Sequence, residues 1–526
     1  MPVAQSRPKS PAGTATMLVT RFHVVHGLLV VLATAVAAAL RLQDLGTWSF
    51  WVDEAHSWRD ATMALDGENG FLSEDRRLYP LTFLLLRVLI DVGGLAQDEW
   101  SLRLPFALIG IATVPLLAVC GRHVIGPGAA VLSAWLLALH PWHVFWSQNA
   151  RGYALVVFGA VIAADRVRAF TQHYRRRDAV ALGAAVLLAV TSHPTGALLA
   201  VAVVAAFLVR QALRWRWTTQ LFAAVVMLLL LWWGPAVAGQ FFPDFMRSKQ
   251  GNSTDHFLRT SVFYFRPALL LLALVGGALL VSRARLGRLL LGCFALAPFV
   301  VMLPMSHEVK VTARFAICAL PAMVWLAAAA CVEVGRAVLA SARLPAHSRL
   351  LAAALLPALF AGELVQQLGE YYTVQHGQRG QWRRAAEVLR ERTQGASLRV
   401  LTVNQPTMLY YLRPGHYSSE VAENDQRTQV MPLIRWMWEQ GRDRPDKNAP
   451  LVHEPGVANH FGWHAKMATA SQTRFAVVVT MPELIEEDRS SEFRVYLADH
   501  FELVAYLPCW IGPKDESIYI YLPKRT

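Results

Sequence analysis

A series of long apolar segments constrains the fold more than any other feature of the sequence. Many of them run for roughly 17–22 residues, the length that a helix needs to cross about 30 Å of hydrocarbon. Hydrophobic residues make up 55% of the 526-residue chain, charged residues only 17%, and the mean hydropathy is +0.34. These values are typical of a polytopic α-helical membrane protein. Eleven spans are predicted, at residues 24–40, 103–121, 127–141, 152–166, 179–191, 194–211, 219–238, 264–281, 287–304, 315–335 and 350–367.

Basic residues are concentrated in one part of the chain. The first 368 residues contain 31 Lys and Arg against 18 Asp and Glu, whereas the remaining residues contain 19 of each kind. Because basic connections stay on the cytoplasmic side, this excess indicates membrane orientation, and no nucleic-acid partner is expected. The basic connections are Arg122, 165–178, 210–217, 283–288 and 336–349. The segments predicted to face outward are then 41–102, 140–153, 192–196, 239–262 and 305–314.

One more apolar run, "YPLTFLLLRVLIDVGGLA", begins at Tyr79. Arg87 and Asp91 lie in its middle, where charges are costly in hydrocarbon, and counting it as a span would place the basic 165–178 connection outside. It is interpreted as a re-entrant or interfacial juxtamembrane helix within the first outer loop, 41–102. Eleven spans then leave the N-terminal segment 1–23 in the cytoplasm and the C-terminus outside.

The sequence changes character after residue 368. "QWRRAAEVLRERT" has the period of an amphipathic helix, "LRVLTV", "RFAVVVT", "FELVAYL" and "SIYIYL" are typical of strands, and 418–459 is loop-like. Residues 369–526 are therefore predicted to form an extracytoplasmic α/β domain attached to a transmembrane domain at 24–368. The predicted location is the inner (plasma) membrane, crossed many times.

An acidic stretch, "FWVDEAHSW" at residues 50–58, follows the first span. Asp53 and Glu54 are adjacent, so on a helix their side chains point about 100° apart and cannot both reach one substrate atom. One is predicted to react, and the other to support it or to face a metal ion. The alternative is an interfacial helix in which Trp residues are anchors and the acids are solvated.

The other predicted outer segments add cationic and polar side chains. "HPWHVFWSQNARGY", "SHPTG" and "SHEVKVTARF" contain four His together with Arg151, Lys310 and Arg314. Acids and cations on one face suit an anionic substrate and a hydroxyl group that must be activated. A transporter would instead concentrate ionisable groups at mid-membrane in broken, paired spans. A transporter or flippase of lipid-linked glycans, and a non-catalytic scaffold, are the alternatives to an enzyme.

Several short motifs occur in a characteristic order. They are "WVDEAHSW", "LYPLTFLLLR", "SLRLP", "QNARGYAL" and "TARFAICALP", followed in the tail by "YYTVQHGQRGQWRRAAEVL" and "VLTVNQPTMLYYL". In this order they resemble the membrane-embedded GT-C glycosyltransferases, with the closest likeness to the protein O-mannosyltransferase and aminoarabinose (lipid A) transferase group. These enzymes use polyprenyl-phosphate-linked sugars on the non-cytoplasmic face of a membrane.

The resemblance implies an inverting transfer of sugar from a polyprenyl-phosphate donor to a hydroxyl acceptor, within membrane lipid. It implies Asp53 and Glu54 as the catalytic pair, with Asp53 as general base. Cationic groups would stabilise the departing phosphate, with Arg103 and Arg151 as first choices. The substrate- and phosphate-binding residues are expected to be Arg103, Arg151, Tyr153, His193, Lys310, Arg314 and Tyr79.

Two positions depart from the family pattern. Leu78-Tyr79-Pro80 stands where many relatives read His-Pro-Pro, and Asn149 stands where relatives often carry an acid. Both changes remove contacts for a phosphate or a metal ion. No cofactor is required, and a divalent metal, where bound, would use Glu54 and His56. The sequence does not identify the sugar that is transferred, and the acceptor could be a protein, lipid A or a polysaccharide.

Overall fold

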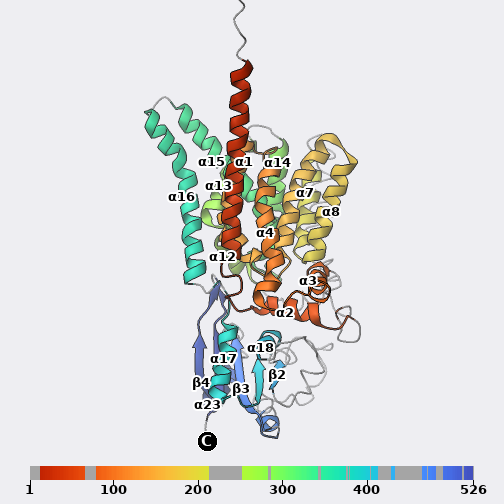
Figure 1. The fold of residues 1–526 in the computed structure, drawn as a ribbon, viewed down its shortest axis with the longest axis vertical. Helices are drawn as coiled ribbons and strands as arrows, with labels where there is room; N and C mark the ends of the chain where they lie inside the picture. The colour runs from red at the N-terminus through yellow and green to blue at the C-terminus, as the bar shows by residue number, and fades with distance from the viewer. Residues whose placement is uncertain are drawn as a thin grey trace, which may run out of the picture.

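The computed structural model describes residues 12–65, 71, 79–212, 252–281, 286–341, 345–374, 377, 379–402, 404–412, 428–432, 465–470, 472–480, 490–511 and 514–524. The predicted span at 219–238, Leu78 and most of the loop-like stretch 418–459 lie outside these residues. The described chain forms a bundle of helices above a small β-sheet, with α2 (Val52–Thr62) and α3 (Leu81–Asp91) at the end of the bundle that faces the sheet (Figure 1).

The bundle follows the apolar segments of the sequence. A helix lies at ten of the eleven predicted span positions, and the eleventh position is the one outside the described residues. The helices are α1 (Ala12–Leu42), α4 (Glu99–Gly121), α5 (Pro127–Leu139), α6 (Pro141–Ser147), α7 (Tyr153–His173), α8 (Arg176–Ser192), α9 (Gly196–Ala212), α12 (Thr254–Phe265), α13 (Pro267–Val281), α14 (Leu286–Met305), α15 (Leu320–Ala340) and α16 (Ala346–Thr373).

Four described helical stretches are each long and apolar enough to cross a membrane: Val24–Leu42, Glu99–Gly121, Ala313–Ala340 and Ala346–Thr373. Two pairs of shorter helices, α5 with α6 and α12 with α13, bend by 63° and 85° and would each form one broken span. α3 has 11 residues, about 16 Å at the helical rise, which is too short to cross. The juxtamembrane interpretation of α3 therefore fits, while the number of crossings stays a prediction.

The break between α5 and α6 is stabilised by a buried arginine. Pro141 has no N–H, so the carbonyl of Leu137 cannot receive its usual helical hydrogen bond there. The Arg41 guanidinium, at the end of α1, donates to the carbonyls of Leu137 and Ala138, both at 3.1 Å. Arg41 also donates to the ring of His143 at 2.6 Å. The segment predicted as an outer loop is consequently part of the protein core, and α6 is buried along its whole length.

The tail forms a five-stranded sheet of order β2-β1-β3-β7-β4. β1 pairs in parallel with β2 and β3, whereas β7 pairs antiparallel with β3 and β4. The four predicted strands are present, and residues 428–432, expected to be loop, form β2. The strands are β1 (Leu398–Thr402), β2 (Thr428–Pro432), β3 (Arg474–Thr480), β4 (Phe501–Leu507) and β7 (Ile518–Pro523), with a separate hairpin of β5 (Trp510–Ile511) and β6 (Lys514–Asp515).

Helices cover the sheet, and the first two of them also contact the nearby end of the bundle. The predicted amphipathic helix is α17 (Trp382–Thr393), and α18 (Gln405–Leu412) follows β1, while α23 (Ser490–His500) precedes β4. α16 continues past the predicted domain boundary at residue 368, because Leu364, Leu368 and Tyr371 extend its buried face as far as Thr373. The division into domains at that point stays a prediction.

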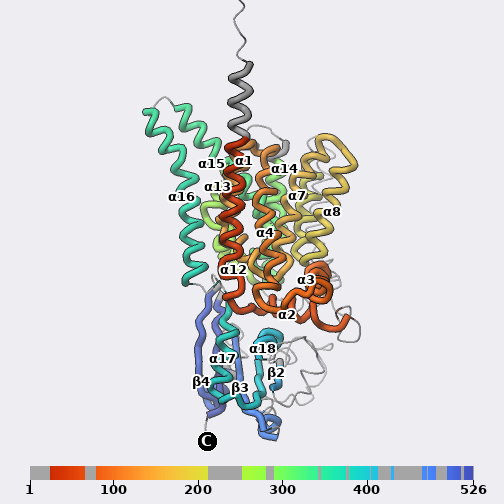
Figure 2. Tube along the Cα trace, in the orientation of Figure 1, coloured from red at the N-terminus to blue at the C-terminus, as the bar shows by residue number. Residues whose placement is uncertain are grey.

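The two ends of the bundle differ as the charge pattern predicts. The α7–α8 and α15–α16 connections, predicted to be cytoplasmic, lie at the end away from the sheet, whereas α2 and α3 lie at the end near it (Figure 2). One orientation of the bundle therefore accommodates both the basic connections and the acidic first outer loop.

Cysteine labelling in intact cells tests this orientation. Gln172 and Glu308 are both exposed, at opposite predicted sides. Gln172→Cys, at the end of α7, should be protected from a membrane-impermeant thiol reagent, because the basic residues around it are predicted to keep it on the cytoplasmic side. Glu308→Cys should be labelled. Permeabilisation should make both positions react. Labelling of Gln172→Cys from outside would contradict the predicted topology.

Candidate active site

The acidic stretch forms the first turn of α2, where the partial positive charge of the helix N-terminus favours carboxylates. Asp53 and Glu54 point in different directions, as their spacing predicts. The side chain of Glu54 is fully buried, whereas that of Asp53 is 27% exposed. One carboxylate is therefore part of the protein interior, and the other lies at its edge.

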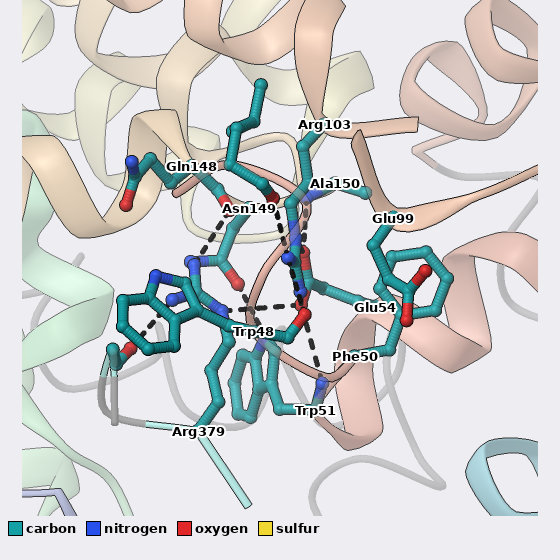
Figure 3. Close-up of polar contacts among 12 residues, drawn as sticks. Trp48, Phe50, Trp51, Glu54, Glu99, Arg103, Gln148, Asn149, Ala150 and Arg379 are labelled. Carbon is teal, nitrogen blue, oxygen red and sulfur yellow. Dashed lines mark hydrogen bonds and ion pairs between the residues drawn. The ribbon is translucent and has the colours of Figure 1, made fainter. Parts of the chain in front are cut away.

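Glu54 is held by a dense set of N–H donors (Figure 3). The Nε and Nη2 atoms of Arg103 each lie 2.7 Å from a different Glu54 oxygen, which is the bidentate geometry of a strong pair. The backbone N–H groups of Ala150 and Trp51 add one hydrogen bond to each oxygen, at 3.0 and 3.3 Å. Burial alone would raise the pKa of Glu54, but the charge and hydrogen bonds of Arg103 hold it below its usual value.

Arg103 is a structural residue rather than the phosphate contact expected from the sequence. Its side chain is fully buried. Besides the two bonds to Glu54, it donates to the carbonyls of Leu45, Trp48 and Ser49, each at 2.9 Å. These five bonds use all five N–H groups of the guanidinium, so none is left for a substrate. The expectation for Arg103 is corrected accordingly.

A second arginine, Arg379 from the tail, completes the surroundings of Glu54. Its Nε lies 3.6 Å from a Glu54 oxygen. Its other nitrogens donate to the hydroxyl of Tyr371, to the carbonyl of Gly377 and to the carbonyl of Gln148, at 3.0, 2.7 and 2.7 Å. Sequence reasoning missed Arg379, although the tail motif "YYTVQHGQRGQW" contained it.

Asp53 faces different partners. Arg314, in the 3-10 helix η3 (Ala313–Ala319), places Nη1 at 3.8 Å from an Asp53 oxygen. Arg151, half-buried in the turn before α7, donates to the Ser57 hydroxyl at 3.2 Å and more weakly to the Asp53 carbonyl at 3.4 Å. Within the described residues, the Nε atoms of both arginines lack a hydrogen-bond partner. The structure thus brings together Asp53, Arg151 and Arg314, which are 98 or more residues apart in sequence.

An aromatic group lies beside these charges. The His193 ring packs against Tyr153 in a tilted arrangement, with centroids 4.1 Å apart, and its centroid lies 6.4 Å from that of Tyr79. Burial, and then the charge of Arg151, keep the pKa of His193 well below its usual range, so the ring is neutral at pH 7. Its Nδ1 accepts from the backbone N–H of Thr195, which leaves the proton on Nε2. The three residues expected at the substrate site from the sequence are therefore neighbours.

Trp51 connects the two carboxylates' surroundings. Its indole N–H donates to the side-chain oxygen of Asn149 at 2.6 Å, and the Arg314 guanidinium lies 5.7 Å from its ring. The side-chain oxygen of Asn149 is thus occupied as an acceptor for Trp51. Lys310 is exposed in the segment before η3.

The residues present do not fit the metal site that the resemblance left open. Both oxygens of Glu54 already accept two N–H hydrogen bonds each, so Glu54 has no lone pair directed at a cation. Among the residues that the structure describes, no three His, Cys, Asp or Glu side chains gather as metal ligands do. The hydrogen bonds of Glu54 therefore do not favour the open possibility of a metal ion held by Glu54 and His56.

The fold and sequence are similar to known glycosyltransferases. Residues 79–236 match the family model described as dolichyl-phosphate-mannose-protein mannosyltransferase. The Archaeoglobus fulgidus oligosaccharyltransferase, in a structure tethered with an acceptor peptide, is 13% identical with a TM-score of 0.53, covering 95% of this chain and 74% of that chain. ArnT from Cupriavidus metallidurans, bound to undecaprenyl phosphate, is 17% identical with a TM-score of 0.49, covering 93% and 97%. No curated protein matches in sequence.

The resemblance to the membrane-embedded GT-C glycosyltransferases is thereby confirmed. The likeness to the archaeal enzyme is one of fold. The segment matched by the family model includes Tyr79, Arg103, Arg151, Tyr153 and His193 and begins after the acidic stretch. The family match therefore does not include Asp53 and Glu54, whose roles stay predictions.

The structural role of Arg103 predicts a large loss of stability when it is removed. Arg103→Ala leaves Glu54 as a buried, underpaired charge, and such losses cost about 3–5 kcal/mol. Thermal unfolding of the purified protein in detergent should show a marked drop in the midpoint. Arg151→Ala is the matched control, because among the described residues Arg151 makes two long hydrogen bonds at the edge of the site, and the unfolding midpoint of this variant should change little. Equal midpoints for both variants would contradict the assigned role.

The lowered pKa of Glu54 predicts how stability depends on pH. A carboxyl whose pKa is lower in the folded than in the unfolded protein stabilises fully above its unfolded value, near 4.5. This contribution is lost as the pH falls through the lower folded value. The free energy of unfolding of the wild type should therefore fall more steeply than that of Glu54→Gln as the pH decreases below about 4.5. Unfolding of both proteins can be followed by intrinsic tryptophan fluorescence. Parallel pH curves for the two proteins would argue against the shift.

Proposed function

We propose that the protein transfers a sugar from a polyprenyl-phosphate donor to a hydroxyl acceptor at the outer face of the inner (plasma) membrane, with inversion at the anomeric carbon. The observation that carries the proposal is the partly exposed Asp53 beside Arg314, at 3.8 Å, with its neighbour Glu54 turned away and fully paired. A partly exposed carboxylate that can take a proton and a partly exposed cation that can bind an anion therefore lie side by side.

The reaction divides into roles that these side chains suit. Asp53 takes the proton of the acceptor hydroxyl as that oxygen forms a bond to the anomeric carbon. The bond between this carbon and the phosphate oxygen breaks, and its electron pair leaves with the lipid phosphate. Displacement on one face and departure on the other invert the configuration. Glu54 supports the step by fixing α2, so it acts as a structural partner of Asp53.

Arg314 and Arg151 are the proposed phosphate contacts. Each has an Nε without a hydrogen-bond partner among the described residues, and guanidinium groups bind phosphate oxygens strongly. The neutral His193 can donate a hydrogen bond from Nε2–H, and the rings of Tyr153 and Tyr79 lie beside it. Lys310, exposed four residues before Arg314, can add a further positive charge at the rim.

The donor class is proposed from the matching family, whose description names a dolichyl-phosphate-linked sugar. A lipid donor also suits the exposed apolar surfaces of the bundle, such as Leu351 and Leu359 of α16, which surrounding membrane lipid would cover. The candidate site lies where the first outer loop meets the bundle, at the end of the bundle that faces the tail (Figure 1). This arrangement supports an extracytoplasmic tail domain.

Asp53→Asn tests the base. The amide keeps the size of the carboxylate but cannot accept the acceptor's proton, and loss of a general base costs about two to four decades of rate. Transfer of labelled sugar from a polyprenyl-phosphate donor by the purified variant should fall by this amount, with folding and donor binding retained. Near-normal turnover would remove Asp53 from the mechanism. Movement of the lipid-linked sugar across the membrane without its transfer would favour a transporter instead.

Arginine replacements test the phosphate contacts. Arg314→Ala and Arg151→Ala each remove a charge-assisted contact worth about 1.5–3 kcal/mol, so the donor KM should rise roughly 10- to 100-fold. Arg259→Ala is the control, because Arg259 is a largely exposed arginine of α12 paired only within its own helix turn to Asp255. Its donor KM should stay at the wild-type value. An unchanged KM in both site variants would place the phosphate elsewhere.

A further inference from the structure

The segment that leads into α2, residues 46–50, has no regular structure of its own and is held from two sides. On the bundle side, Arg103 of α4 donates hydrogen bonds to the carbonyls of Trp48 and Ser49. On the tail side, side chains more than 300 residues away in sequence bind the same short segment. Backbone groups in irregular segments need such partners when water is excluded.

Arg383, in the first turn of α17, provides one of the tail contacts. Its Nη1 donates to the carbonyl of Thr47 at 3.1 Å and its Nη2 to that of Gly46 at 3.2 Å. Its backbone N–H donates to the Ser49 hydroxyl at 3.1 Å. The same Nη2 lies 2.6 Å from Glu99, the first residue of α4. Arg383 therefore connects the tail, the approach segment and the bundle.

Tyr411, in α18, provides the contact nearest to the candidate base. Its hydroxyl accepts the backbone N–H of Phe50 at 2.6 Å and donates to Glu99 at 2.8 Å. Phe50 is fully buried, and it precedes Asp53 by three residues. Burial, and then the charge of Glu99, raise the pKa of Tyr411 well above its usual range, so the hydroxyl keeps its proton. One hydroxyl thus fixes the backbone at the entry to α2.

We propose that Tyr411 is a positioning residue for the reaction, through which the tail sets the place of Asp53 relative to Arg314. This proposal rests on the proposed role of Asp53 as the base. Asp53 lies in the first turn of α2 and 3.8 Å from Arg314, so the position at which α2 begins sets the place of its carboxylate. A displacement of about 1 Å of a reacting group can cost on the order of 100-fold in rate. The tail is accordingly part of the catalytic apparatus of the bundle.

The neighbouring Tyr410 offers a matched control. Its hydroxyl lies 2.8 Å from the carbonyl of Gln97 and 3.5 Å from the second carboxylate oxygen of Glu99, so it donates within the same interface between α18 and the start of α4. Both tyrosines keep their rings when changed to Phe, so each variant loses one hydroxyl and the bond that it donates. Tyr411→Phe alone also releases the N–H of Phe50. Any difference between the two variants therefore reports on the approach segment rather than on docking of the tail.

The test measures turnover and donor KM of the full-length protein with Tyr411→Phe and Tyr410→Phe. Tyr411→Phe should lower kcat roughly 10- to 100-fold with little change in donor KM, as expected for a misplaced base, and Tyr410→Phe should resemble the wild type. Both variants should also be made in the Asp53→Asn protein. A residue that acts through Asp53 loses its effect there, so the two changes should be strongly non-additive.

Each outcome decides a separate point. Equal kcat values for the two Phe variants, or a full effect of Tyr411→Phe in the Asp53→Asn background, would overturn the positioning role. Near-normal turnover of Asp53→Asn alone would instead overturn the proposed base. If Tyr411→Phe does not fold, Arg383→Ala takes its place in the same cycle, because the Arg383 side chain is 41% exposed and holds the same segment.

Discussion

The buried ion pair between Glu54 and Arg103 organises the outer end of the bundle. A carboxylate without water around it is unstable unless it is paired and hydrogen-bonded, so Glu54 of α2 has to lie against Arg103 of α4. Because Arg103 also holds the carbonyls before α2, the pair determines both where the helix starts and how it is rotated. Once Glu54 faces inward, Asp53 lies about 100° around the helix and reaches the edge of the protein. The exposure of the candidate base follows from the burial of its neighbour.

Five arginines around the candidate site fall into two groups, one that binds the protein backbone and one that is available to a substrate. Arg41, Arg103 and Arg379 are fully buried and donate to backbone carbonyls where helices break or the chain is irregular. Arg151 and Arg314 are partly exposed and keep nitrogens without hydrogen-bond partners in the described residues. The guanidinium group suits both tasks, since its donors are numerous and its charge is permanent. Exposure separates these two groups, whereas an Nε without a hydrogen-bond partner does not, because Arg379 has one as well.

The helices and strands could be predicted from local sequence, whereas the contacts between distant parts of the chain could not. Long apolar segments predicted the helices, and short apolar runs predicted the buried strands β1 and β3, because those patterns report burial along one element. The adjacency of Asp53 and Glu54 predicted their separation. The partner of Glu54 was not predictable, since Arg103 lies 49 residues away and "SLRLP" contains an arginine equally suited to phosphate. Arg379 and Tyr411 were missed for the same reason: their contacts arise only when the tail folds against the bundle.

The charges at the site resolve a conflict in the proposed chemistry. A base must stay ionised while an anionic phosphate binds close by, and two negative charges in one place oppose each other. Asp53 and Glu54 are accompanied by Arg103, Arg379, Arg151 and Arg314, so cations outnumber anions among these six residues. Arg103 and Arg379 together carry one positive charge more than is needed to neutralise Glu54. This excess positive charge lies next to the first turn of α2, which also carries Asp53. Arg314 and Arg151 are then available to the incoming phosphate without leaving the base as an isolated charge. The tail contributes Arg379 to this balance, which is a second reason, besides the bond from Phe50 to Tyr411, for its presence next to the bundle.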